Sequence, residues 1–178
     1  MPFYQLKHTQ KIPASIVEAW KFISSPINLK EITPGYLGFE VTGDTDISKM
    51  YPGMIITYKV SPLFGIKLNW MTEITHVKYN EYFVDEQRIG PYKFWHHQHK
   101  IVAIEGGVLM TDIVTYQPPL GFLGAIANAV MIKKQLKQIF DFRTVAIEKR
   151  FGQYPLPKQN EGFDKLTLPT ITVTNILN

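Results

Sequence analysis

The spacing of apolar and polar residues divides the chain into three parts. In the first part, residues Phe3–Ile12 alternate and are rich in β-formers, which predicts a strand. Ser15 and Glu18 then fit a capping box, and apolar residues follow at helical spacing to about Ser24. A second short helix is expected over residues 25–33, because this stretch opens with Ser-Pro and is followed by Pro-Gly.

The second part has the short apolar runs that are typical of strands. Gly, Pro, Asn and Asp separate these runs, for example at Gly43-Asp44 and at Pro62–Gly65. Connections this short favour antiparallel neighbours that are joined in a meander. The predicted strands are Leu37–Thr42, Met54–Val60, Ile66–Val77, Tyr82–Ile89, Lys93–Ile104 and Val108–Tyr116.

The third part predicts one long helix, from about Gly121 to Phe151. Its apolar residues fall on one side of a helical wheel, and Arg143 lies within this apolar stripe. The run Leu120–Ile132 is apolar nearly all round, and we expect ordinary burial rather than a gate or a contact with membranes. Residues 153–178 are rich in Pro, Asn and Thr, so we expect them to wrap the surface or to be partly mobile.

This order of elements predicts an α+β fold with one domain over residues 1–152. A sheet with one apolar face must be covered, and the long amphipathic helix is the only large cover available. We therefore expect a curved antiparallel sheet of about seven strands around a long C-terminal helix. Two short helices are expected after the first strand, and a cavity between the sheet and the long helix.

Composition and charge exclude several classes of function. The 178 residues are 45% hydrophobic and include no cysteine, which excludes a disordered chain, disulfides and cysteine-based metal sites. Residues 133–150 hold six basic and two acidic side chains, and six minus two equals the whole net charge of +4. No nucleic-acid recognition motif accompanies them, so no nucleic-acid partner is expected. Without a signal sequence or an apolar run of roughly 20 residues, we expect a cytoplasmic monomer or homodimer with no stable membrane insertion.

One predicted hairpin concentrates the side chains that could carry chemistry. Its two strands meet at Gly90-Pro91, and the second strand has three polar or aromatic residues at alternate positions, Trp95, His97 and His99. Alternate side chains of a strand point to the same face. If this face looks inward, it places an indole and two imidazoles inside the cavity.

A set of motifs extends over about residues 3–150. It comprises Ile12-Pro13-Ala14 leading into Trp20, Asn28-Leu29 with Ile32-Thr33-Pro34, Pro52-Gly53 with Tyr58, Trp70 with Ile74, Phe83-Val84-Asp85-Glu86-Gln87 with Gly90-Pro91, Trp95-x-His97-x-His99, Asp112 with Tyr116 and Pro118, and Phe140-Asp141-Phe142-Arg143. In order and kind these motifs resemble the SRPBCC or START-like superfamily, and in particular bacterial ligand-binding members of undetermined function, some of which are labelled as related to a cell-division inhibitor. The resemblance implies the helix-grip fold, whose members include polyketide cyclases and lipid-binding domains and act on very different apolar molecules.

The register of the hairpin decides which side chains face His97. An odd-length loop places Asp85 opposite His97, whereas a two-residue loop exchanges the faces. In the first case Asp85 and Gln87 join the histidine face, and in the second Glu86 and Arg88 take their place. We adopt Asp85 and Gln87, because the resemblance aligns the family motif with them.

The sequence favours a cavity that binds a hydrophobic or amphipathic small molecule, such as a lipid, a polyketide or an aromatic compound. Ligand sites pair apolar walls with a few polar groups. A buried carboxylate without a partner would be costly, so Asp112 needs a histidine or arginine nearby, and Arg143 is the obvious candidate. The candidate ligand-binding residues are Tyr58, Trp70, Asp85, Gln87, Trp95, His97, His99, Asp112, Tyr116 and Arg143.

Three alternatives stay open. His97, oriented by Asp112, could act as the general acid or base of a cyclase or dehydratase type of enzyme. His97, His99 and Asp112 could together hold a divalent metal, but strand histidines two residues apart are common without one, so we expect neither a metal nor a cofactor. The lysines between residues 133 and 137 could bind a partner through salt-sensitive contacts.

Overall fold

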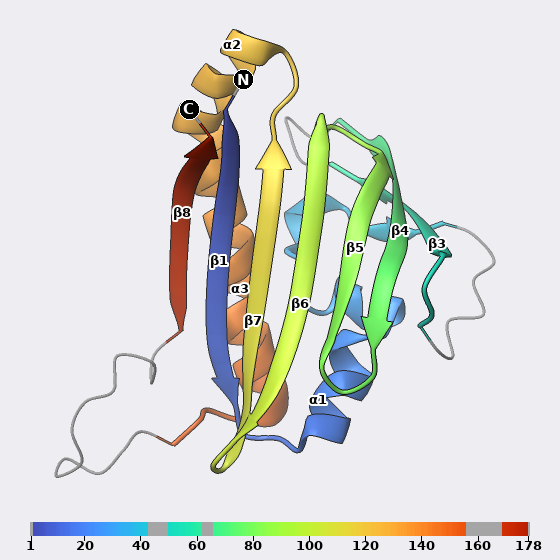
Figure 1. The fold of residues 1–178 in the computed structure, drawn as a ribbon, viewed down its shortest axis with the longest axis vertical. Helices are drawn as coiled ribbons and strands as arrows, with labels where there is room; N and C mark the ends of the chain where they lie inside the picture. The colour runs from blue at the N-terminus through green and yellow to red at the C-terminus, as the bar shows by residue number, and fades with distance from the viewer. Residues whose placement is uncertain (1, 43–49, 62–65, 156–168, 178) are drawn as a thin grey trace, which may run out of the picture.

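An antiparallel sheet of eight strands lies against one long helix (Figure 1). The computed structural model describes residues 2–42, 50–61, 66–155 and 169–177, so the expected turns at Gly43-Asp44 and Pro62–Gly65 lie outside it. The strand order is β2-β3-β4-β5-β6-β7-β1-β8. The strands are β1 (Phe3–Ile12), β2 (Glu40–Val41), β3 (Met54–Val60), β4 (Leu68–Lys78), β5 (Tyr82–Ile89), β6 (Phe94–Ile104), β7 (Gly107–Gln117) and β8 (Thr170–Leu177). The helical elements are α1 (Ile16–Ile23), the 3₁₀ turns η1 (Pro26–Lys30) and η2 (Gly35–Leu37), α2 (Gly121–Ala127), the π-helical turn η3 (Asn128–Ile132) and α3 (Lys133–Phe151).

The α+β class, the meander and the helices after the first strand are confirmed. β1, β3 and β5 have the bounds that the sequence predicts. The capping box of α1 is also present: the Glu18 amide donates to Ser15 Oγ over 3.3 Å, and the Ser15 amide donates to Glu18 Oε2 over 3.0 Å. Local sequence signals therefore decide most of the elements that surround the cavity.

The strand predicted over Leu37–Thr42 is wrong in extent. Only Glu40 and Val41 pair with β3, and residues 35–37 form the 3₁₀ turn η2. Gly38 follows this turn with a φ of +54°, a conformation that glycine adopts without steric cost. Because Leu37 belongs to this turn, the strand begins only at Glu40.

β8 belongs to the segment for which the sequence composition predicts a surface or partly mobile tail. It pairs antiparallel with β1, as the eighth strand of a sheet for which about seven strands were predicted. Ile171 and Val173 pack against the cluster that includes Leu6. The alternation of these two residues with threonines is an ordinary strand signal, which the Pro-rich stretch before it obscures.

The long C-terminal helix is interrupted by the π-helical turn η3. Asn128 begins this turn, and its Oδ1 accepts a hydrogen bond of 2.8 Å from the Tyr116 hydroxyl. In α2, Gly124 is buried against the carbonyl oxygen of Pro119, where an added Cβ would overlap that oxygen. Small residues thus face the protein in this part of the helix.

The expected burial of Leu120–Ile132 is wrong. Most large apolar side chains of this run face solvent, because the inward positions are held by Gly124 and Asn128. Only Ile132, at its end, is a buried large side chain. Among the described residues, no helix combines the length and the apolar character that crossing a membrane requires.

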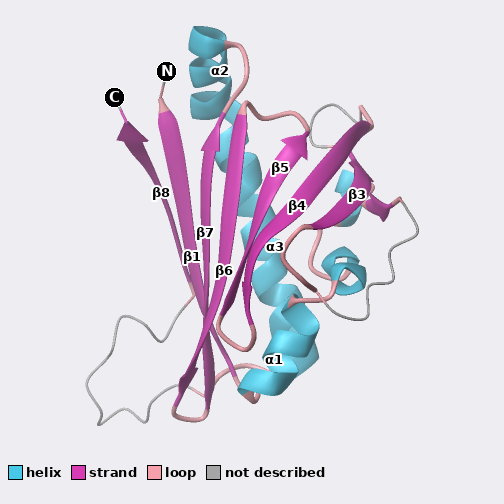
Figure 2. Cartoon of the chain, turned by 45° about the vertical axis from the view of Figure 1, so that its right-hand side comes forward, coloured by secondary structure: helices cyan, strands magenta, loops and turns pink. Residues whose placement is uncertain are grey.

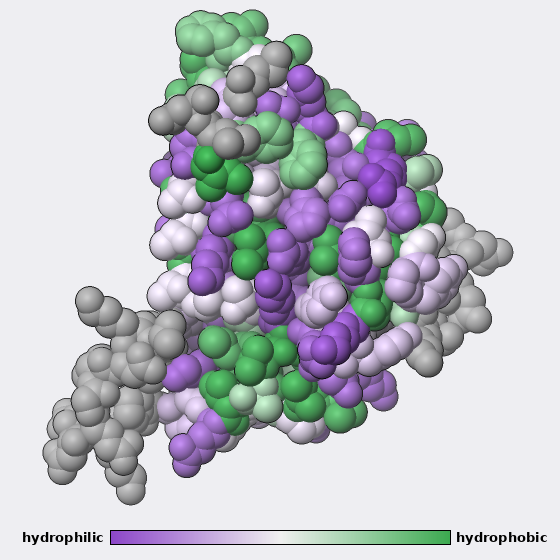
Figure 3. Space-filling model, viewed as in Figure 1, coloured by the Kyte–Doolittle hydropathy of each residue, from purple (hydrophilic) through white to green (hydrophobic). Residues whose placement is uncertain are grey.

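The helices α1 and α3 cover the same face of the sheet (Figure 2). One hydrophobic cluster lies around Trp20 and Ile147, and a second lies around Leu6 and Phe140. The opposite face of the sheet is open to solvent and mixes polar and apolar side chains (Figure 3). The buried side chains of α3 include Arg143, as the helical wheel predicts, so the helix brings a guanidinium to the inner face of the sheet.

Candidate functional site

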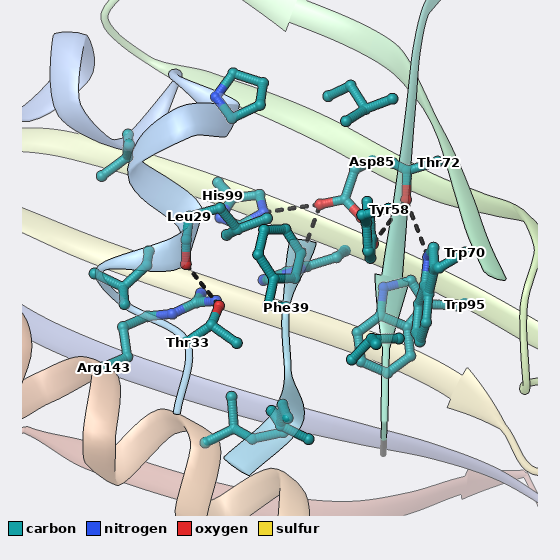
Figure 4. Close-up of a pocket in the computed structure, with 18 of the residues that line it drawn as sticks. Leu29, Thr33, Phe39, Tyr58, Trp70, Thr72, Asp85, Trp95, His99 and Arg143 are labelled. Atoms are coloured by element: carbon teal, nitrogen blue, oxygen red, sulfur yellow. Dashed lines mark hydrogen bonds and ion pairs between the residues drawn. The ribbon is translucent and has the colours of Figure 1, made fainter. Parts of the chain in front are cut away.

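A cavity of about 170 Å³ lies between the sheet, η1 and α3 (Figure 4). Most of its wall is apolar, with Leu29 from η1 and with Leu136 and Phe140 from α3. Its volume is close to that of an engineered apolar cavity that binds benzene, roughly 150 Å³, and is below the roughly 300 Å³ of pockets for drug-sized ligands. The cavity therefore suits a small ring system or a short chain.

Aromatic side chains from β3, β4 and β6 form one side of the cavity. The rings of Tyr58 and Trp70 stack with centroids 5.8 Å apart, and Trp95 meets Trp70 edge-on at 5.3 Å. Thr72 Oγ1 lies 3.0 Å from Trp70 Nε1 and 3.1 Å from the Tyr58 hydroxyl. Buried indole and phenol groups need such a partner. With their polar atoms satisfied by Thr72, these rings offer apolar faces and edges to a ligand.

Polar side chains of β5 and β6 form another side, and the register of the hairpin brings them together. Asp85 lies opposite His97, so the odd-length loop is the correct alternative. His99 lies opposite Asp112 on the neighbouring strand β7. His97, His99 and Asp112 are buried, as an inward-facing strand face requires.

Asp112 is fully buried behind the cavity wall and is the centre of the polar cluster. Its Oδ1 lies 3.0 Å from His97 Nε2, 2.9 Å from His99 Nδ1 and 3.3 Å from Arg143 Nη1, and its Oδ2 lies 3.4 Å from His8 Nδ1. Burial alone would raise the pKa of Asp112, but the Arg143 guanidinium and the histidine hydrogen bonds lower it well below its ordinary range. Since an ionised carboxylate only accepts hydrogen bonds, each histidine turns an N–H towards it.

Asp85 contacts both cavity histidines, whose pKa values shift in opposite directions. Asp85 Oδ2 lies 2.9 Å from His99 Nε2 and 3.5 Å from His97 Nδ1. Against the effect of burial, the hydrogen bonds to Asp112 and Asp85 raise the pKa of His99. Burial and the neighbouring His99, whose ring centroid is 3.7 Å away, lower the pKa of His97 to about 4. When His99 is protonated, its charge and that of Arg143 balance those of the two aspartates.

His8 completes the cluster, although the sequence interpretation did not include it. It pairs with Asp112 in the β1–β7 register, and its Nε2 lies 2.9 Å from Thr144 Oγ1 on α3. His8 is two residues from Leu6 in the first strand, so both side chains point to the same face, and Leu6 is fully buried. This spacing could have predicted that His8 faces the interior. Its contact with Asp112 could be predicted only with the pairing of β1 and β7.

Three predicted ligand-binding residues do not line the cavity: Asp112, which lies behind its wall, and Gln87 and Tyr116. Gln87 holds the turn of the hairpin, since its Nε2 donates to the Tyr92 carbonyl over 2.6 Å and its Oε1 accepts from the Tyr92 amide over 3.2 Å. Tyr116 is buried in the second cluster, where it bonds to Asn128. Gln87 still acts on the cavity, because Tyr92 is one of its lining residues.

Arg143 has a hydrogen-bonding group that the protein does not use. Its guanidinium is buried and lines the cavity, and its Nε–H has no hydrogen-bond partner among the described residues. A buried donor without a partner costs roughly 1–3 kcal/mol. A residue that lines the cavity thus carries an unpaired donor on a cation.

Neither a protein-family model nor a curated protein matches the sequence. Solved structures match the fold: protein CV1439 from Chromobacterium violaceum is 10% identical, with a TM-score of 0.63, over 83% of this chain and 97% of that one. Ara h 8.0201, a Bet v 1-like helix-grip protein, is 13% identical, with a TM-score of 0.53, over 83% of this chain and 99% of that one. This chain has the helix-grip fold. Protein Ms6760 from Mycobacterium smegmatis also matches, with 17% identity and a TM-score of 0.57 over 82% of this chain and 92% of that one.

These identities show the fold alone, and a fold does not determine a function. The function has to be argued from the residues that this helix-grip protein places in its cavity. Those residues form an aromatic wall and a polar wall, and one of them, Arg143, carries an unpaired guanidinium N–H.

The polar wall also contains a possible metal site, with a different third ligand from the one the sequence suggests. Asp85, His97 and His99 each offer one ligand atom, and these atoms lie within 4.8 Å of one another. Asp112 would hold the outer N–H groups of the histidines. A divalent cation would compete with a proton for His99, whose pKa is raised.

The stability of the folded protein is expected to be highest near pH 6.5 and to fall on both sides. Below pH 6.5 the unfolded chain protonates His97, while the folded chain keeps it neutral down to a pKa of about 4, so stability falls as the pH falls. Above pH 6.5 the unfolded chain loses the His99 proton that the folded cluster retains, so stability falls as the pH rises. Urea unfolding at a series of pH values measures both slopes, each up to about 1.4 kcal/mol per pH unit for one proton.

Two variants separate this cluster from other titrating groups. His97→Asn should flatten the slope between pH 4 and 6.5, whereas His76→Asn, at an exposed position, should leave it unchanged. Equal stability of the wild-type protein at pH 4.5 and pH 6.5 would contradict a neutral, buried His97.

Proposed function

We propose that the protein is a member of the SRPBCC superfamily that binds an amphipathic small molecule in the cavity. The apolar part of the ligand would lie against Trp70 and Trp95, and an oxygen acceptor, such as a carboxylate or carbonyl, would accept from Arg143 Nε. The observation that carries the proposal is this buried, unpaired Nε–H on a residue that lines a mostly apolar cavity. An oxygen of the ligand would satisfy it.

The size and lining of the cavity indicate which kind of ligand fits. Aromatic rings favour offset or edge-on contacts with other rings, and Trp70 and Trp95 are already arranged edge-on to each other. A ring system placed beside them gains contact with both. The volume of about 170 Å³ favours a one- or two-ring compound over a long-chain lipid.

The contacts of His97 favour binding over catalysis. A general base needs a nitrogen that reaches the substrate proton. One ring nitrogen of His97 is engaged by Asp112 at 3.0 Å, and the other faces Asp85 at 3.5 Å. Neither is directed only at the cavity. In the enzyme alternative, His97→Ala abolishes a pH-dependent turnover while ligand affinity survives.

A matched pair of probes tests the proposed function. We expect 2-naphthoate to bind one-to-one with a Kd of roughly 1–100 μM, as measured by quenching of tryptophan fluorescence. Trp70 and Trp95 line the cavity and report on it, while Trp20 lies in another cluster. Arg143→Lys keeps a positive charge beside Asp112 but lacks the Nε–H, and should weaken 2-naphthoate binding about tenfold.

The neutral 2-methylnaphthalene serves as the control, because it has the same rings and no acceptor. Its affinity should change less than about twofold in Arg143→Lys. An equal loss for both probes would mean that Arg143 shapes the cavity without contacting the ligand. Absence of binding by either probe to the folded wild-type protein would refute the proposed function.

A further inference from the structure

One end of the molecule exposes an unusual group of large apolar side chains. We call it the apolar tip, and it consists of Leu120, Phe122, Leu123, Ile126 and Val130. Their exposed fractions range from 47% for Ile126 to 79% for Phe122. Figure 3 shows hydrophobic residues gathered at this end, where Figure 1 places α2 beyond the edge of the sheet. The tip is independent of the cavity and of the function proposed for it.

The tip is not a poorly buried part of the core. Its helix places Gly124 and Asn128 against the protein and turns the large side chains outward. Gly124 fits so closely against Pro119 that no larger residue could take the inward position. An amphipathic surface helix normally does the reverse. The outward apolar face is therefore a fixed feature, and contiguous exposed apolar surface of this kind marks an interaction site.

The charges beside the tip indicate the kind of partner. Lys133 and Lys134 follow it within one helical turn, are exposed and form no ion pair among the described residues. Lys137 lies one turn further and pairs with Asp141 over 2.8 Å. Residues 118–140 contain no Asp or Glu. An apolar surface with a basic border and no acidic side chain complements an anionic lipid surface.

We propose that the apolar tip docks this protein onto anionic lipid bilayers. The apolar side chains enter the boundary between headgroups and acyl chains, and Lys133 and Lys134 contact lipid phosphates. A second copy of the chain is a poorer partner for the same surface. A two-fold interface would place tip against tip and would bring the lysines of both copies together. Docking of this kind is peripheral and agrees with the lack of a membrane-crossing helix among the described residues.

Vesicle flotation tests the proposal on the full-length protein. We expect the wild-type protein to float with phosphatidylcholine vesicles that contain 30% phosphatidylglycerol, and to bind pure phosphatidylcholine at least tenfold more weakly. Raising the salt from 0.1 M to 0.5 M should release most of the protein, since it screens the lysine contacts. Phe122→Ser/Leu123→Ser should lose at least tenfold in affinity, and Lys133→Gln/Lys134→Gln should lose the preference for anionic vesicles.

The control changes two apolar side chains of similar exposure far from the tip. Val17→Ser/Val102→Ser alters positions on α1 and β6 that are 61% and 59% exposed, and should float as the wild-type protein does. Unchanged flotation of Phe122→Ser/Leu123→Ser would overturn the proposal, and so would absence of wild-type flotation. Sedimentation equilibrium tests the alternative that a second copy of the chain binds the tip. A wild-type dimer that Phe122→Ser/Leu123→Ser dissociates would assign the tip to self-association and would also overturn the proposal.

Discussion

Asp112→Asn is expected to lower the free energy of unfolding by about 3–5 kcal/mol, the usual result of removing one partner from a buried ion pair. The substitution keeps the shape of the side chain and removes its charge. Arg143 would then lack its only ion-pair partner among the described residues, and the donors of His97 and His99 would share a neutral amide oxygen in place of a charged acceptor. Urea unfolding at pH 6.5 measures the loss as a lower midpoint with an unchanged m-value.

Asp141→Asn is the matched control for the loss of one carboxylate. Asp141 is exposed and pairs with Lys137 one helical turn away, so its replacement should change the free energy of unfolding by less than about 0.5 kcal/mol. The double variant Asp112→Asn/Arg143→Met should lose less than the sum of its single variants, because it removes the unpaired charge. A loss below about 1 kcal/mol for Asp112→Asn would show that the cluster is solvated rather than buried.

Leu29→Trp is expected to weaken the binding of 2-naphthoate about 100-fold, which corresponds to roughly 2.7 kcal/mol. Leu29 projects from η1 into the cavity and is only partly buried (Figure 4). The larger indole occupies space that the ligand needs, and the position at the cavity edge lets the fold accommodate it. Isothermal titration calorimetry measures the affinity, and urea unfolding should show a change in stability within about 1 kcal/mol.

Val102→Trp places the same indole on the solvent face of β6 and serves as the control. Val102 is exposed and alternates with the buried Ile101, so its side chain lies outside the cavity. Its substitution should leave the affinity for 2-naphthoate unchanged. Comparable binding by Leu29→Trp and the wild-type protein would place the ligand at a site other than the cavity.

Local sequence patterns predict the walls of the cavity well, for a physical reason. Strand alternation puts Trp95, His97 and His99 on one face, and the helical wheel puts Arg143 on the inner side of α3. These inferences need only the periodicity of one element. Asp85 needed one further fact, the length of the hairpin loop, and the resemblance to the SRPBCC superfamily supplied the correct register.

The remaining features depend on contacts between distant elements, which periodicity does not encode. His8 joins Asp112 only because β1 pairs with β7, more than a hundred residues away along the chain. Gln87 lies on the strand face expected for the cavity, but its side-chain amide donates to the Tyr92 carbonyl in the turn instead. The sequence pattern does not predict the exposure of the apolar tip either. An apolar run is normally expected to be buried, and only the structure shows that its small residues face the protein.

A crystal structure of the complex with 2-naphthoate tests the central claim most directly. We expect the rings in the cavity beside Trp70 and Trp95, and a carboxylate oxygen within hydrogen-bond distance of Arg143 Nε. The Asp112 cluster should keep its contacts, since the ligand uses only the guanidinium donor that the protein leaves unpaired. An empty cavity at saturating 2-naphthoate, or a ligand whose carboxylate points away from Arg143, would contradict the account.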